Sequence, residues 1–76
     1  MKPQIGSLLK ARNIKNEDDV ILMRLKCIEG LGYCVCDVDN DKVLTSGYED
    51  VECFNIGEVV FGRGIREYKI IDILNE

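Results

Sequence analysis

The stretch VILMRLKCIEGLGYCVCDVD, residues 20–39, decides the fold class of this chain of 76 amino acids. Two apolar-rich runs flank Gly30-Leu31-Gly32, and each run alternates between two kinds of side chain, as a half-buried antiparallel sheet requires. If Gly30 and Leu31 form the tip of a hairpin, apolar side chains face one another on one side of the sheet. The pairs predicted on that side are Cys27 with Cys34, Leu25 with Cys36, and Met23 with Val38.

A second hairpin follows directly. Asp39-Asn40-Asp41-Lys42 reads as a turn, because Asp and Asn tolerate left-handed backbone conformations. With Asn40 and Asp41 at its tip, Val38 faces Val43 and Cys36 faces Thr45, again on the apolar side. The two hairpins together predict a three-stranded meander.

The rest of the chain favours further strands. Alanine occurs only at Ala11, whereas the β-branched residues Val and Ile are frequent. The C-terminal run is ambiguous, because apolar residues recur there every third position while Ile70, Ile71 and Ile73 favour a strand; we expect a strand. The expected strands are residues 5–13, 20–29, 33–39, 43–46, 54–61 and 66–74, with one short helical turn within residues 47–52.

These short strands must curl to bury a core, so we expect a mostly β fold of about five strands over a single domain, residues 1–76. The architecture would be a small barrel or a strongly bent antiparallel sheet. The opening Ile5-Gly6-Ser7-Leu8-Leu9-Lys10-Ala11, the long hairpin at 20–39 and a closing strand near 68–73 resemble an SH3-like barrel. That resemblance implies a binding module.

A second resemblance is to a family of small bacterial proteins encoded near type VII secretion loci. It rests on Ile5-Gly6-Ser7, Phe54-Asn55, and Val60-Phe61 followed by Gly62 or Gly64. The segment between Phe54 and Val60 is shorter here than in that family. The resemblance implies no specific activity.

Composition excludes several functions. The 14 acidic residues exceed the 10 Lys and Arg, which gives a net charge of −4 and argues against a nucleic-acid partner. Histidine is absent, so the commonest general base and metal ligand are missing and Ser7 and Ser46 have no activator. No signal peptide or membrane span is visible, and we expect a cytoplasmic, non-enzymatic protein without a cofactor.

The four cysteines, Cys27, Cys34, Cys36 and Cys53, are expected to be reduced and to fill the core. Two alternatives stay open: a four-thiolate metal site, although no C-x-x-C motif supports it, and a redox pair formed by Cys27 and Cys34. Because the core interpretation is favoured and no C-x-x-C motif is present, we predict no bound metal.

Two charged motifs have plain structural interpretations. Asp37-Val38-Asp39-Asn40-Asp41 resembles the start of a calcium loop, but Lys42 and Tyr48 occupy the positions that need Gly and Glu. Asp37 is instead expected to pair with Arg24 across the hairpin. The basic cluster Gly62-Arg63-Gly64-Ile65-Arg66, with Lys69, is expected to be a turn next to a solvated strand, and a phosphate contact is the alternative.

The function predicted is protein–protein binding through an edge strand or an aromatic groove. The candidate binding residues are Tyr33, Asp37, Tyr48 and Phe54. One alternative is a small acidic inhibitor, of phage or mobile-element type, whose acidic groups at 17–19, 37–41 and 49–52 occupy a basic site of a nucleic-acid machine. A third hypothesis is a protein that binds a small ligand or a metal. Formation of a homo-oligomer is left open.

Overall fold

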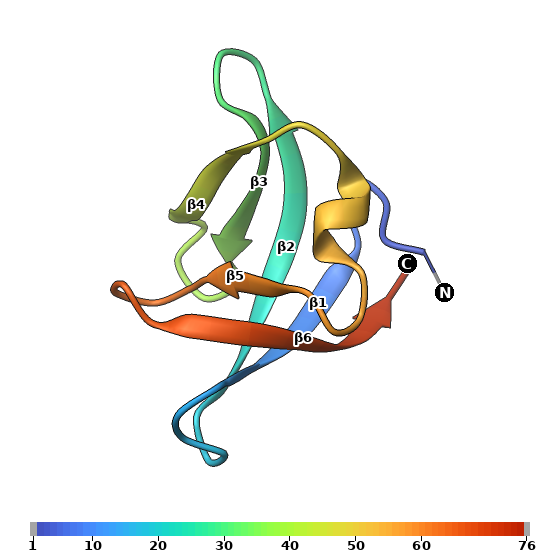
Figure 1. Ribbon diagram of the computed structural model, residues 1–76. Coiled ribbons are helices and arrows are strands. Elements are labelled where there is room, and N and C mark those ends of the chain that lie inside the picture. Colours follow the sequence, from blue (N-terminus) through green and yellow to red (C-terminus); the bar gives the residue numbers. More distant parts are fainter. Residues whose placement is uncertain (1, 76) are drawn as a thin grey trace.

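The computed structural model describes residues 2–75 as an antiparallel sheet of six strands that curls into a nearly closed barrel (Figure 1). Strand order in the sheet is β4-β3-β2-β1-β6-β5. The mostly β, strongly bent architecture is thus confirmed, and so is the C-terminal strand. The elements are β1 (Leu8–Asn13), β2 (Val20–Ile28), β3 (Gly32–Asp37), β4 (Val43–Tyr48), the 3₁₀ turn η1 (Val51–Phe54), β5 (Val59–Phe61) and β6 (Glu67–Leu74).

The topology is a meander that closes on its own beginning. Strands β1 to β4 follow one another by hairpins, η1 carries the chain onward, and the β5–β6 hairpin returns so that β6 pairs with β1. The two outermost strands, β4 and β5, come into contact at the seam of the barrel (Figure 1). No ladder joins them among residues 2–75, so each keeps one free edge there.

Alternate side chains of the strands fill the barrel, as period-two patterning requires. The element η1 contributes one more: its N-cap Asp50 accepts a hydrogen bond of 3.0 Å from the Glu52 N–H, and the turn inserts Phe54 into the interior. The central cluster consists of Leu9, Ala11, Ile21, Met23, Leu25, Val35, Phe54, Val60, Tyr68, Ile70 and Ile73.

The β2–β3 hairpin differs from the prediction by one residue. Its loop has three residues, 29–31, because Ile28 pairs with Gly32 and the Leu31 N–H bonds to the Ile28 carbonyl at 3.0 Å. Gly30 takes a positive φ of 86°, which a residue without Cβ adopts freely. The predicted two-residue tip is therefore wrong, and every pair shifts by one position.

The shift moves two cysteines to the other side of the sheet. Val35 lies opposite Leu25 in the core, whereas Cys34 lies opposite Lys26 and Cys36 lies opposite Arg24. A slip of one residue turns a whole strand over in this way. The predicted pairs Cys27 with Cys34, Leu25 with Cys36, and Met23 with Val38 are wrong.

The second turn lies where it was predicted, but it is longer than the predicted two-residue tip, because β3 ends at Asp37 and β4 begins at Val43. The pairing beyond it differs as well. Asp41 has a φ of 59°, the left-handed conformation expected of an Asx residue there. Irregularities in the β3–β4 ladder then place Val43 opposite Cys36 and Thr45 opposite Val35. The predicted pairs of Val38 with Val43 and of Cys36 with Thr45 are wrong.

Candidate functional site

The three aromatic candidates lie together, but only two of them reach the surface. Phe54 is fully buried in the core, and the Tyr48 ring meets it edge-on with centroids 4.8 Å apart at 64°. Tyr33 lies opposite Tyr48 in the β3–β4 ladder, and both are half-buried against the core. Only Tyr33 and Tyr48 therefore offer surface to a partner, and Phe54 acts through the packing of Tyr48.

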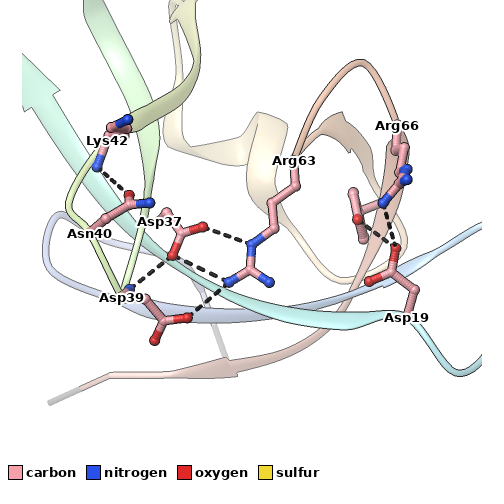
Figure 2. A network of polar contacts seen from close by, with 8 residues as sticks. Asp19, Asp37, Asp39, Asn40, Lys42, Arg63 and Arg66 are labelled. Carbon is pink, nitrogen blue, oxygen red and sulfur yellow. Dashed lines mark hydrogen bonds and ion pairs between the residues drawn. The ribbon is translucent and has the colours of Figure 1, made fainter.

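Asp37, the fourth candidate, is the centre of a polar network (Figure 2). Arg63 donates from Nε to Asp37 Oδ2 at 2.7 Å and from Nη2 to Oδ1 at 3.3 Å, and Nη2 also reaches Asp39 Oδ2 at 3.0 Å. The Asp39 N–H donates to Asp37 Oδ1 at 2.9 Å. These donors, Arg63 first, hold the pKa of Asp37 below its usual value.

The expected pair of Asp37 with Arg24 is wrong. In the shifted register Asp37 lies opposite Met23, while the Arg24 guanidinium donates to the Gly6 carbonyl at 2.8 Å. Arg63 reaches Asp37 from the loop between β5 and β6, so the ion pair bridges the seam of the barrel from β5 to the end of β3. It connects the two sides of the seam at one end, where no backbone ladder joins them among residues 2–75.

A second network fixes the other end of the same loop. Asp19 Oδ2 accepts hydrogen bonds from the Tyr68 hydroxyl at 2.6 Å and from Asn13 Nδ2 at 3.0 Å, and Arg66 Nη1 lies 3.9 Å away. The Tyr68 bond is the main reason that the pKa of Asp19 is lowered. Burial, followed by the same bond, raises the pKa of Tyr68.

These networks account for most of the charged motifs. Arg63 and Arg66, two of the three cations in the basic cluster, face carboxylates of the fold, which the sequence did not predict. These two arginines neutralise part of the negative charge of the acidic groups at 17–19 and 37–41. In the third acidic group, Asp50 caps η1. Many of the charged side chains in these motifs therefore make contacts within the fold itself.

The cysteines occupy different surroundings. Cys34 and Cys36 are buried outside the central cluster, Cys53 packs against that cluster, and Cys27 is exposed. Burial, followed by the neighbouring Cys36, raises the pKa of the Cys34 thiol, which keeps it protonated. The prediction that all four fill the core is wrong for Cys27, which lies next to the last residue of β2 and is exposed. Within residues 2–75, no group of three or more His, Cys, Asp or Glu is placed to hold a metal ion.

Strand β5 presents apolar side chains to solvent at the free edge of the sheet. Val60 is buried, so Val59 and Phe61 point outward and remain 44% and 48% exposed. Ile65 in the following loop is 90% exposed. The sequence shows three consecutive apolar residues here and does not reveal which of them face the core, so neither Val59 nor Phe61 was identified from it as a surface residue.

Two pockets lie on either side of Ile14, which follows β1. The larger, of about 460 Å³, lies over β1 and β6 and contains Arg12, Lys69 and Ile56 among its lining residues. The smaller, of about 380 Å³, extends from Ile14 to the β5–β6 loop at Ile65. Sequence reasoning singled out Ile65, Arg66 and Lys69 only as parts of the basic cluster, with a phosphate contact as the alternative. It did not find the pockets themselves, because their other walls come from segments that only the closed sheet brings together.

A scan against protein-family models, a search of curated proteins and a search of solved structures found no match to this chain. None of residues 2–75 belongs to a helix with the length and apolar character needed to cross a lipid bilayer.

Proposed function

We propose that this protein is a non-enzymatic interaction module whose protein partner docks on the free edge of β5. The observation that carries the proposal is the outward pair Val59 and Phe61, held at an unpaired sheet edge. Native proteins usually shield such edges with charge, proline or a covering segment. Here the edge carries two large apolar side chains instead.

An edge strand recognises an extended segment in a simple way. Backbone hydrogen bonds to the free edge supply affinity, and alternate side chains of the added segment find neighbours on the strand. Val60 anchors β5 in the core and β6 holds its other edge, so the docking strand is rigid before binding. Phe61 is then the expected main contributor to affinity, since aromatic anchors dominate interfaces.

The architecture supports the same class of function. The meander of β1 to β4, the 3₁₀ turn η1 and the return of β6 onto β1 support the proposal of an SH3-like barrel. The relationship to proteins encoded near type VII secretion loci and the cytoplasmic location stay predictions. The acidic-inhibitor alternative is less favoured, because Arg63 and Arg66 offset two of its three acidic groups.

Site-specific photo-crosslinking in the cells that produce this chain tests the proposal. A benzophenone amino acid replaces Phe61 in one variant and Leu22 in the control, since Leu22 is 40% exposed on β2, away from the edge. We expect one nuclease-resistant protein adduct from position 61 and none from position 22. Adding Val59→Asp to the first variant should abolish the adduct.

The outcomes discriminate between the alternatives. An adduct between two copies of this chain would identify the partner as a second copy, and an adduct with a different protein would name a distinct partner. Equal adducts from positions 61 and 22, or none from position 61, would contradict docking on β5.

A further inference from the structure

We propose that the larger pocket, over β1 and β6, binds a small amphiphilic carboxylate, that is, one anionic head group on a short aliphatic body. This site adjoins the docking strand, because Lys69 pairs with Val59 of β5, but the proposal does not rest on docking at that strand. The pocket has a volume of about 460 Å³, within the usual range of small-molecule sites. Its walls combine two cations with four isoleucines, of which all but the fully buried Ile70 reach the surface, and this combination indicates the ligand.

The head group would be held by Arg12 and Lys69. These residues lie directly opposite each other in the β1–β6 ladder, both are exposed, and both line the pocket. Like charges at facing positions repel. Neither has an ion-pair partner among residues 2–75, although Glu17 also lines the pocket. Two cations therefore share a site with one carboxylate that pairs with neither.

The aliphatic body would be held by Ile14, Ile56 and Ile71. Ile14 and Ile56 come from two loops and are 49% and 55% exposed. Ile71 is the extra residue of a bulge, because Lys10 pairs with Asp72 while Ala11 pairs with Ile70. Burying these side chains against an alkyl chain is favourable at about 25 cal/mol per Å² of apolar surface.

The polar groups of the walls disfavour a peptide as the ligand. The Ile14 N–H bonds to the Glu67 carbonyl at 3.1 Å, and the Gly57 N–H bonds to the Ile70 carbonyl at 2.8 Å. The Asn13 side chain donates to Asp19 and accepts from the Lys15 N–H. A ligand rich in amides would leave its own donors and acceptors unmatched, which costs free energy.

The charge balance further narrows the head group. A planar carboxylate matches the guanidinium fork of Arg12, and Lys69 adds a second positive charge. Glu17 stands at the same pocket, so a dianion such as a phosphate monoester would meet more repulsion than a monoanion. The proposal is accordingly a monocarboxylate.

Titration of the ¹⁵N-labelled chain with sodium octanoate, followed by NMR, tests the site. Two further ligands separate the contributions: acetate has the head group alone, and 1-octanol has the aliphatic body alone. We expect saturable shifts of the amide signals of Ile56, Gly57 and Ile71 with octanoate. Acetate and 1-octanol should each bind at least about tenfold more weakly, which corresponds to roughly 1.4 kcal/mol.

Charge variants complete the test. Lys69→Gln and Arg12→Gln should each weaken octanoate binding at least about fivefold. Lys42→Gln removes the same charge from the exposed β3–β4 turn and should leave binding unchanged. Signals outside the pocket report whether each variant stays folded.

Three results would overturn the proposal. The first is equal binding of octanoate and 1-octanol, which would leave only an apolar patch. The second is a set of non-saturating shifts spread over the surface. The third is equal weakening by Lys69→Gln and Lys42→Gln, which would indicate a general charge effect. The docking proposal is tested separately, because the crosslink from position 61 uses neither these ligands nor these charge variants.

Discussion

Replacing Arg63 by Gln should destabilise the barrel at its seam. Arg63 donates two hydrogen bonds to the Asp37 carboxylate, at 2.7 and 3.3 Å, and the backbone N–H groups of Asp39 and Asn40 also bond to it. The Asp37 side chain is only 6% exposed. The substitution would therefore leave a nearly buried, ionised carboxylate with backbone donors only, from Asp39 and Asn40.

The expected loss is moderate. A hydrogen bond to a charged group contributes about 1.5–3 kcal/mol, but the Arg63 side chain is 44% exposed, so water replaces part of what is lost. We expect a decrease of about 1.5–2 kcal/mol in the free energy of unfolding at pH 7. For a domain of this size, that corresponds to a decrease in Tm of roughly 10 °C.

Urea and thermal unfolding between pH 2 and 7 measure the effect. Because Arg63 lowers the pKa of Asp37 in the folded state, the carboxylate contributes its full stability above the unfolded pKa of about 3.9 and loses it as the pH falls through the folded value. The difference between the original chain and Arg63→Gln should therefore be constant from pH 7 to about 5 and shrink below about 4.

Two comparisons make the result decisive. The double variant Arg63→Gln, Asp37→Asn should show a coupling energy of about 1 kcal/mol or more. Lys26→Gln breaks the exposed pair of Lys26 with Asp41, whose side chains are 37% and 72% exposed, and should change stability little. If Arg63→Gln and Lys26→Gln had equal effects, or if the Arg63 effect persisted unchanged at pH 2, the seam ion pair would not stabilise the barrel as argued.

Three further predictions depend on which side chains are buried and which are exposed. Gly62→Ala should lower the free energy of unfolding by about 1–3 kcal/mol in urea titrations, since an added Cβ would lie 2.5 Å from Cδ2 of the buried Tyr68 ring. Tyr68→Phe should destabilise the fold and remove a component of the phenolate absorbance titration above the ordinary tyrosine pKa, because burial raises the pKa of Tyr68. Cys27 should react rapidly with a thiol reagent and Cys34 and Cys36 only on unfolding, so that Cys27→Ser removes the fast phase.

Local patterns predicted the elements of this fold well. Alternation within β2 and β3 and the β-branched residues of β6 correctly indicated strands. The left-handed Asp41 followed from its residue type in a turn. Each of these features depends on interactions within a few residues, which a single sequence contains.

Register and partners were less predictable, because they depend on loop geometry and on distant segments. One extra residue in the β2–β3 loop reversed the faces of Cys34 and Cys36. Asp37 bonds to Arg63, which lies 26 positions along the chain, and only the closure of the sheet brings the two together. The hydrophobic pattern alone could not distinguish a two-residue from a three-residue loop.

Cationic side chains that have no ion pair within the fold indicate where an anionic ligand can bind. Arg63 and Arg66 face carboxylates, whereas Arg12 and Lys69 face each other on adjacent strands without an ion pair among residues 2–75. A domain of 76 residues has a small core and a thin stability margin, so a repulsive pair is a measurable burden on it. A bound carboxylate would remove that repulsion, and a ligand that binds only the folded state raises its stability. The same pair of residues therefore links the stability of the barrel to the occupancy of the pocket.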